Sequence, residues 1–413
     1  MVMRPNLDSK IFGKYLSKFG LEHTFQSVSI DKETQIILTI PSYKEPELYV
    51  TLKSLIEAKA PTKPIDVYVL VNASEEASTN DLLLNEQSKR QVLEFASKDF
   101  ENLRFHLLVE EQMPKKNAGV GLARKIVMDF ALEQFAKIEK DGLIVCFDGD
   151  STVSDNYFLE LEKAARDQEA VGGSLYFEHD LEQLMDNTAM LYYELFLRYY
   201  VRGLKFTGYP FSSHTVGSSM YCTCSAYIRI GGMNKRKAGE DFYFLHKLMA
   251  QGKFLELKDL KVIPSCRESD RVPFGTGRAM QNWSQGDKSK QFSYDPEVFN
   301  YLKKLVQALN SAKRNTKWEE FSQNLPSEIL NFLEVVDFEV FFRESANKAK
   351  EESVFKKRLW IWWDGFRFLK LVHFLRDNYF PNIPAEEACR RLIGIESNDL
   401  EVLLEEYRIL DRT

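Results

Sequence analysis

The stretch Gly142-Leu143-Ile144-Val145-Cys146-Phe147-Asp148-Gly149-Asp150-Ser151 decides the fold expected for this chain. Its apolar first half predicts a short strand buried on both faces of a sheet. Asp148 and Asp150 then emerge at the carboxyl end of that strand, where open α/β sheets bind their ligands. Hard oxygen ligands of this kind suit Mg²⁺ or Mn²⁺. An isolated Asp-Gly-Asp more often marks a solvated turn, so the flanking sequence has to decide between a site and a turn.

The composition limits the kinds of protein that this chain can be. With 413 residues, 44% of them hydrophobic, the chain is long enough to bury more than one core. A net charge of -6 provides no polybasic surface, which excludes nucleic acid as the main partner. Five scattered cysteines indicate reduced thiols and a cytoplasmic location. Because no run approaches the ~20 apolar residues of a membrane span, we expect a soluble chain or one that lies on a membrane surface.

Apolar runs alternate with helical patterns through the first part of the chain. Strands are predicted at 35–40, 65–71, 103–109 and 142–147, with amphipathic helices between them. Asn117 is expected to cap the last of these helices. This order predicts a doubly wound, mostly parallel α/β sheet with helices on both faces. Further strands are predicted at 170–177 and 219–230, and a helix opens at Gly239-Glu240-Asp241. Beyond about 300 the pattern is helical to the end.

Four segments occur in a fixed order: Pro41-Ser42-Tyr43-Lys44-Glu45, Lys116-Asn117-Ala118-Gly119-Val120-Gly121-Leu122-Ala123-Arg124, Asp148-Gly149-Asp150 and Gly239-Glu240-Asp241. In this order and spacing they resemble the family 2 nucleotide-sugar glycosyltransferases, which have the GT-A fold. The resemblance covers roughly residues 33 to 260. It implies a GT-A glycosyltransferase domain, placed at 31–285. Helical periodicity predicts a helical extension before it, at 1–30, and a helical region after it, at 286–413.

The resemblance also implies roles for individual residues. Asp150, with Asp148, would bind the metal, and Asp241 would be the catalytic base. The nucleotide sugar would be bound by the residues at matching positions, namely Pro41, Tyr43, Glu45, Asn117, Gly119, Arg124 and Asp148. Asn72 belongs to the same set but departs from the pattern, because many relatives have an acidic residue there for the uracil ring. The donor is therefore expected to be a UDP- or GDP-linked sugar.

Elementary chemistry supports these roles. A sugar leaves its nucleotide as a diphosphate, and a metal held by carboxylates can neutralise the charge that develops on it. The acceptor hydroxyl must lose a proton as it attacks, and a carboxylate at a helix start, such as Asp241, can accept that proton because the helix amino terminus keeps it ionised. The alternative for Glu240 and Asp241 is simple compensation of the helix dipole.

The expected reaction is a single transfer to a saccharide, a glycolipid or another hydroxyl acceptor. Polymerising relatives have a Gln-x-x-Arg-Trp motif, and the nearest stretch here, Gln281-Asn282-Trp283, lacks that arginine. We therefore expect a non-processive enzyme. An inverting course is expected, and a retaining course stays open because similar folds run both.

Three further segments suggest contacts and have plain alternatives. Arg271 and Arg278 lie in an arginine- and glycine-containing stretch, 267–278, which would suit a loop over the diphosphate or an exposed basic loop. Glu240 and His214 are candidates for the acceptor side, although a lone histidine is usually structural. Aromatic and basic residues at 355–372 suit either peripheral membrane contact or a core helix.

Two rival functions follow from the same residues. Asp148-x-Asp150-x-Thr152 after an apolar strand also fits a phosphatase of the haloacid dehalogenase type. That motif normally follows the first strand of its domain, whereas here three predicted strands precede it. The non-enzymatic rival is a lectin-like scaffold on a decayed transferase fold, which the presence of both Asp150 and Asp241 disfavours.

Overall fold

The computed structural model describes residues 9–413, apart from 22, 27, 270 and 272–274. The chain divides into two compact units. Unit 1 contains the described residues up to Met185 together with Thr215–Asn282 and Arg412–Thr413, and unit 2 contains Asp186–His214 and Trp283–Asp411. Residues 186–214, which the sequence placed in the transferase domain, are thus grouped with the carboxyl-terminal helices. The domain boundaries at 31–285 and 286–413 stay a prediction.

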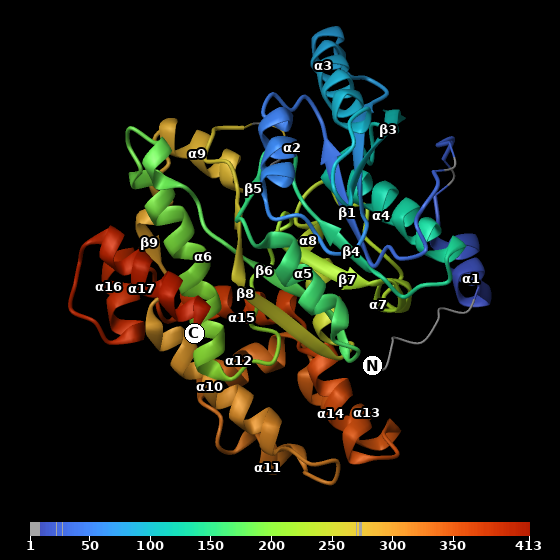
Figure 1. Cartoon of the computed structure of the whole chain (residues 1–413). Coiled ribbons are helices and arrows are strands. Elements are labelled where there is room, and N and C mark those ends of the chain that lie inside the picture. The colour runs from blue at the N-terminus through green and yellow to red at the C-terminus, as the bar shows by residue number, and fades with distance from the viewer. Residues whose placement is uncertain (1–8, 22, 27, 270, 272–274) are drawn as a thin grey trace. The chain divides into compact units, whose positions relative to one another are not determined.

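Unit 1 is built on one eight-stranded sheet with the strand order β3-β2-β1-β4-β7-β6-β8-β5 (Figure 1). Its elements in chain order are α1 (Ser9–Phe19), β1 (Ile36–Ser42), α2 (Leu48–Glu57), β2 (Ile65–Ser74), α3 (Thr79–Ala96), β3 (Leu103–Met113), α4 (Val120–Lys137), β4 (Leu143–Cys146), β5 (Thr152–Val153), α5 (Tyr157–Arg166), β6 (Ala170–Phe177), a 3₁₀ turn at Leu181–Gln183, β7 (Met220–Thr223), α7 (Cys224–Arg229), α8 (Glu240–Met249), β8 (Lys253–Ile263) and α9 (Thr276–Ser284). Strands β1 to β4 are mutually parallel, and β6 is parallel to β8. β7 is antiparallel to β4 and to β6, and β5 is antiparallel to β8.

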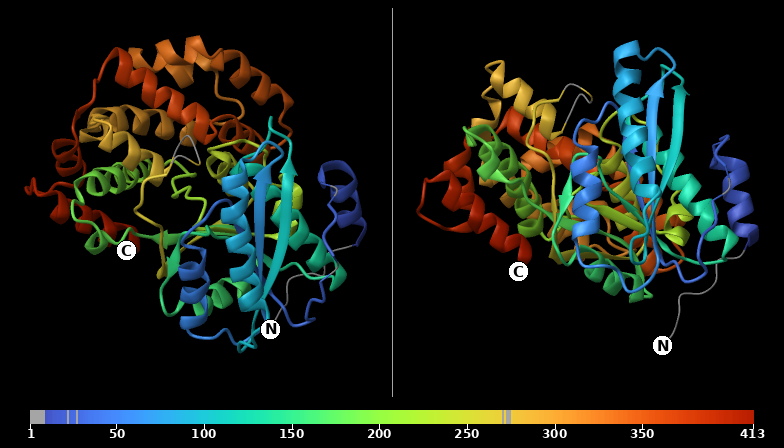
Figure 2. Two further views of the ribbon diagram at one scale, coloured as in Figure 1. Left: turned by 90° about the horizontal axis from the view of Figure 1, so that it is seen from above. Right: turned by 45° about the horizontal axis from the view of Figure 1, so that its top comes forward.

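The helices cover both faces of this sheet. α2 and α3 pack on each other, and α3 contacts β2 and β3, whereas α4 contacts β1, β2 and β4. Right-handed crossovers require this arrangement, because the chain moves outward from β1 to β3 and then returns past β1 to β4. The left view of Figure 2 shows α3 and α4 on opposite sides of the strands. The predicted fold class, an α/β sheet with helices on both faces and a carboxyl-terminal helical region, is confirmed.

The centre of the sheet is apolar on both faces, as the apolar run before Asp148 predicted. All four residues of β4 are buried, and β4 lies between β1 and β7. The register pairs Leu143 with Ile36 on one side and with Thr223 on the other. A strand with both faces covered has to be apolar throughout, which explains the unbroken run before Phe147.

Two local predictions are wrong. The strand predicted at 219–230 ends at Thr223, because the Thr223 hydroxyl accepts a hydrogen bond from the Ala226 amide at 3.1 Å and caps helix α7. Cys224 therefore lies on a helix, not on the strand with Cys222. Asn117 was expected to cap α4, but the capping position is Gly119. β5, α5 and β8 were not predicted.

The cysteines behave as small apolar residues. None of the five is in a disulfide, and all except Cys266 are buried. Burial raises the pKa of Cys146 to about 11, so this thiol is not a thiolate at neutral pH.

Unit 2 is helical. Its elements are α6 (Thr188–Thr207), a 3₁₀ turn at Ser289–Gln291, β9 (Phe292–Ser293), α10 (Pro296–Ser311), α11 (Trp318–Ser322), α12 (Ser327–Val335), α13 (Phe338–Lys348), α14 (Glu352–Trp362), α15 (Gly365–Asn378), β10 (Ile383–Pro384), α16 (Ala385–Ile393) and α17 (Leu400–Arg412). Phe355, Trp363 and Phe368 of the 355–372 stretch are buried in its core. Among the described helices, none is long and apolar enough to cross a membrane.

Candidate functional site

The predicted site lies at one edge of the sheet in unit 1, where parallel strands end. Glu45 follows β1, Asp148 and Asp150 follow β4, and Arg267 and Arg271 follow β8. β1 and β4 are neighbours, and β8 runs in the same direction as β6. Open α/β sheets bind their ligands at this edge.

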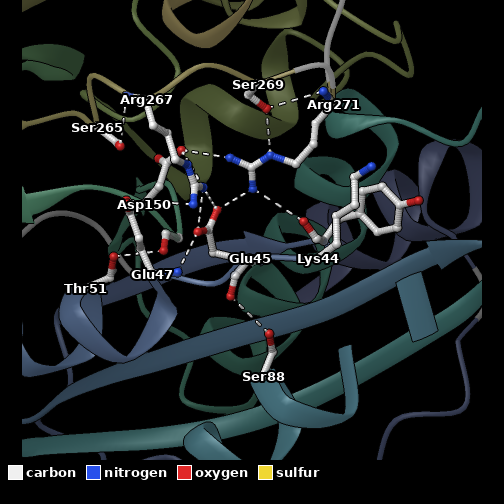
Figure 3. Close-up of polar contacts among 12 residues, drawn as sticks. Lys44, Glu45, Glu47, Thr51, Ser88, Asp150, Ser265, Arg267, Ser269 and Arg271 are labelled. Carbon is white, nitrogen blue, oxygen red and sulfur yellow. Dashed lines mark hydrogen bonds and ion pairs between the residues drawn. The ribbon is translucent and has the colours of Figure 1, made fainter. Parts of the chain in front are cut away.

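Two arginines and two carboxylates form the first ion-pair cluster (Figure 3). Glu45 is buried, and its carboxylate is paired with both Arg267 and Arg271. Asp150 Oδ2 lies 3.0 Å from Arg271 Nη2 and 3.5 Å from Arg267 Nη2. Ser269 Oγ accepts a hydrogen bond from Arg271 Nε at 3.0 Å. The guanidinium of Arg271 therefore bridges Glu45, in the segment after β1, and Asp150, in the segment after β4.

Arg124, in the second turn of α4, organises a second cluster. Its side chain is buried, with Nη2 2.6 Å from Asp148 Oδ1 and Nε 3.0 Å from Glu240 Oε1. This single side chain joins the Asp-Gly-Asp segment after β4 to the Glu240-Asp241 pair at the start of α8. Arg124 Nη1 is buried and has no hydrogen-bond partner among the described residues. Because an unpaired buried donor is costly, this nitrogen marks a position for an acceptor atom of a ligand.

Asp241 lies beside Glu240 and is half-buried. Its Oδ1 accepts a hydrogen bond from the Phe242 amide at 2.7 Å. Burial, followed by the Glu240 carboxylate, raises the pKa of Asp241 to about 7, against the lowering effect of Arg124. The helix amino terminus was expected to keep this carboxylate ionised. The structure corrects that expectation, because burial and Glu240 outweigh the helix dipole.

Asp150 is also shifted. Burial, and then the charges of Asp148 and Glu45, raise the pKa of Asp150 to about 6, although Arg271 and Arg267 lower it. The site's carboxyl groups outnumber its guanidinium groups, the carboxyl groups being Glu45, Asp148, Asp150, Glu240 and Asp241 and the guanidinium groups Arg124, Arg267 and Arg271. An excess of carboxyl groups over guanidinium groups favours a divalent cation.

Asp148 and Asp150 therefore fit the metal that the resemblance implies. Among the described residues, no group of three or more metal-ligating side chains is gathered in one place. Mg²⁺ does not require such a group, because it is usually held by one or two carboxylates together with substrate phosphates.

The other predicted nucleotide-binding residues lie on three further segments of unit 1, at the ends of β1 and β2 and before α4. Pro41 and Tyr43 are at the end of β1, where the Tyr43 hydroxyl donates to Asp81 Oδ2 at 3.0 Å. Asn72 is buried near the end of β2, and its side-chain oxygen has no partner among the described residues. Asn117 and Gly119 lie in the turn before α4.

Two candidate site residues, His214 and Arg278, contact residues outside the two ion-pair clusters. His214 belongs to unit 2, where its Nε2 lies 2.8 Å from Asp411 Oδ2. This is the structural pairing that a lone histidine usually has. Arg278, in α9, donates from Nη1 to Gln281 Oε1 at 2.6 Å. Neither contact involves Asp148, Asp150 or Asp241.

Sequence reasoning did not select Arg267, although it is paired with the same carboxylates as Arg271. Its spacing of four residues before Arg271 was the available signal, because two arginines in one basic stretch can approach the same acidic residue. The partner, Glu45, is more than 200 positions away, so no local pattern could identify the pair.

Comparisons with known proteins found no matching family model and no matching curated protein. Among solved structures, the chain is similar to Staphylococcus aureus TarS 1-349 in complex with UDP-GlcNAc, at 14% identity over 91% of this chain and 90% of that one, with a TM-score of 0.37. GalNAc-T7 with UDP, GalNAc and Mn²⁺ is similar at 11% identity over 74% of this chain and 57% of that one, with a TM-score of 0.35.

Proposed function

We propose that the chain is a metal-dependent glycosyltransferase that moves a sugar from a UDP- or GDP-linked donor to an acceptor hydroxyl, in a single inverting transfer. The observation that carries the proposal is the bridge made by Arg124. Through it, the Asp-Gly-Asp segment and the Glu240-Asp241 pair belong to one connected network at the carboxyl edge of the sheet. A donor diphosphate and an acceptor hydroxyl need these two groups of side chains side by side.

The donor side of the reaction uses Asp148, Asp150 and the arginines. Asp150 and Asp148 would hold Mg²⁺ or Mn²⁺, which when bound supplies positive charge to the diphosphate leaving group. Arg124 keeps Asp148 oriented and has Nη1 available for an oxygen of the donor. Orienting a bound sugar before reaction lowers the entropic cost of the transition state.

The acceptor side uses Asp241. The acceptor oxygen forms a bond to the anomeric carbon while the bond to the diphosphate oxygen breaks and its electron pair leaves with the nucleoside diphosphate. The proton of the acceptor hydroxyl passes to the Asp241 carboxylate. A base with a pKa of about 7 is well matched to this task, because it is largely ionised just above neutrality and still basic enough to take the proton.

The acceptor, location and membrane contact are parts of the same proposal. The acceptor would be a saccharide, a glycolipid or another hydroxyl compound. Five cysteines with no disulfide among them, four of them buried, suit a reducing cytoplasmic compartment. Fewer residues of 355–372 are available for membrane contact than the sequence suggested, because Phe355, Trp363 and Phe368 are buried in the core. The exposed residues Lys357, Ile361, Phe366 and Lys370 remain for it.

Calorimetry with UDP- and GDP-sugars tests the donor and the metal together. We expect one nucleotide class to bind in Mn²⁺ and to bind at least ~10-fold more weakly in EDTA, because the carboxylates repel an uncompensated diphosphate. Asp150→Asn should lose most of the effect of Mn²⁺. The matched control is Asp155→Asn, five residues along the chain and paired at the surface with Lys59 at 2.9 Å.

Equal donor affinity in Mn²⁺ and in EDTA would remove the metal from the proposal. If no nucleotide sugar binds and the chain instead releases phosphate from p-nitrophenyl phosphate, the phosphatase alternative replaces it. If a nucleotide sugar binds in the presence of metal but no acceptor panel yields transfer, the lectin-like alternative is favoured.

A further inference from the structure

We propose that Arg267 and Arg271 are exchangeable partners of Glu45 and Asp150: the two arginines release Asp150 to a divalent cation and take the donor diphosphate in return. The inference rests on the proposed function and deepens it, because it assigns a diphosphate subsite to Arg267 and Arg271. It also predicts that the two arginines and the metal compete for one carboxylate.

The guanidinium of Arg271 contacts two carboxylates through different nitrogens. Nη1 is paired with Glu45, Nη2 lies 3.0 Å from Asp150 Oδ2, and Nε donates to Ser269 Oγ at 3.0 Å. Figure 3 shows the guanidinium between these groups. Planar guanidinium groups bind carboxylates and phosphates through the same donor geometry, so a diphosphate oxygen can replace a carboxylate oxygen at Nη1 or Nη2.

Arg267 adds a second guanidinium to the same carboxylates. Its Nη2 is paired with Glu45 and lies 3.5 Å from Asp150 Oδ2, and its Nη1 lies 3.8 Å from Glu47. Its side chain is 23% exposed, so a ligand in solvent can reach it. Both arginines follow β8 and therefore lie at the edge of the sheet where ligands bind.

The competition follows from the geometry at Asp150. The oxygen Oδ2 is the atom shared by both guanidinium groups, so a metal bound through the Asp150 carboxylate would lie beside two cations that already contact it. A dication bound to this carboxylate would repel both guanidinium groups and weaken their contacts with Asp150. Metal binding and diphosphate binding by the arginines are therefore coupled in the favourable direction.

The exchange has a signature that a fixed structural ion pair lacks. If the arginines compete with the metal, their removal strengthens the binding of metal alone. If they also bind the diphosphate, their removal weakens the binding of pyrophosphate in the absence of metal. A purely structural role predicts that both affinities fall together, because the carboxylate edge would lose its order.

The experiment uses the full chain with the substitutions Arg267→Gln, Arg271→Gln and both together. Free Mn²⁺ is followed by electron paramagnetic resonance during a titration with protein, and inorganic pyrophosphate is titrated separately by calorimetry in EDTA. We expect the double variant to bind Mn²⁺ at least ~10-fold more tightly and pyrophosphate at least ~10-fold more weakly than wild type. Arg229→Gln, an exposed arginine of α7, is the control with the same charge change.

Unchanged or jointly reduced affinities would overturn the exchange, and so would an equal gain in Mn²⁺ affinity from Arg229→Gln. If the double variant does not fold, Arg271→Lys replaces it, because lysine keeps the charge beside Glu45 but lacks the planar fork of arginine. Its Mn²⁺ affinity should again rise and its pyrophosphate affinity should again fall, both by a smaller factor. If wild type binds neither Mn²⁺ nor any nucleotide sugar, the proposed function itself fails. If wild type binds both and only the opposite changes are missing, the exchange alone is wrong.

Discussion

Asp241 is the residue on which the proposed chemistry depends most directly. Asp241→Asn preserves the size of the side chain and removes its basicity. General-base assistance is worth ~10²–10⁴-fold in rate, so kcat should fall by about that factor while donor affinity, which depends on Asp150 and the arginines, changes little. Steady-state kinetics with a donor identified by calorimetry measure both quantities. The control is Asp259→Asn, an exposed carboxylate of β8.

The pH profile gives the same prediction a second readout. Burial and Glu240 raise the pKa of Asp241 to about 7, so the carboxylate is protonated below that pH and cannot accept the acceptor proton. The wild-type kcat/KM should therefore rise with pH and level off above about 7, and the residual rate of Asp241→Asn should lack this rise. Turnover within a few-fold of wild type, or a product that keeps the anomeric configuration of the donor, would contradict the assignment.

At the residue scale, sequence reasoning identified groups that follow strands or begin helices. Asp148 and Asp150 were selected because an apolar run ends just before them, and Asp241 was selected because Gly239-Glu240-Asp241 resembles the family's motif. Arg267 was not found, and the contact between Arg124 and Glu240 was not predicted. Both depend on side chains that approach each other only after the sheet has formed, so a linear pattern contains no direct signal for them.

At the element scale, the contact between α4 and the start of α8 positions the two halves of the site. Gly121 lies in the first turn of α4, where an added Cβ would clash with the backbone carbonyl of Arg236 and lie 3.0 Å from the Cβ of Glu240. No larger residue fits there without moving the chain that leads into α8. Close approach at Gly121 is what allows Arg124, one turn further on, to reach Glu240.

Gly121→Ala should therefore be destabilising and should impair the site. Overpacking of this kind typically costs ~1–3 kcal/mol, and separation of the two helices would break the pair between Arg124 and Glu240. Thermal unfolding and donor calorimetry measure the two effects. The control is Gly13→Ala in α1, where an added Cβ meets nothing within 4 Å and helix propensity predicts a neutral or slightly stabilising change. Equal behaviour of the two variants would show that the α4 contact tolerates the extra atom.

Strands were predicted correctly where a continuous apolar run of several residues marked them. β1, β2, β3, β4 and β6 appear where the apolar runs predicted them, and α4 begins close to the expected position. The prediction of one strand over 219–230 was wrong because a single capping hydroxyl, that of Thr223, changes the backbone from strand to helix within an apolar run. β5 is two residues long and gave no periodic signal.

At the scale of the whole molecule, the sequence predicted an α/β sheet and a helical region but not the strand order beyond β4. The insertion of β7 between β4 and β6 depends on antiparallel pairing between segments more than 40 residues apart, which leaves no local trace. Residues 186–214 were assigned to the sheet domain because they precede β7 in the sequence. Their helix, α6, packs with α10 and α16 instead, so its apolar face belongs to unit 2.

Unit 2 also has an exposed surface that we define by Lys357, Ile361, Phe366 and Lys370. Ile361 is 49% exposed and Phe366 is 39% exposed, and Lys370 Nζ lies 4.7 Å from the Phe366 ring centre. The stretch 355–372 contains five basic residues and one acidic residue, in a chain whose net charge is -6. Apolar side chains beside lysines favour an anionic lipid surface.

The last prediction is that this surface binds anionic membranes reversibly. Full-length chain should float with phosphatidylserine-containing vesicles at low salt and should be released at about 0.5 M salt, because screening shortens the reach of surface charges. Each lysine near such a surface contributes about 1 kcal/mol, so Lys357→Glu with Lys370→Glu should weaken binding by roughly 30-fold or more. The matched control replaces Val402 and Ile409 by serine, since these exposed residues of α17 lie in an acidic sequence. A chain that stays in the soluble fraction at low salt, or a control that loses as much binding as the lysine variant, would show that this surface is not the membrane contact.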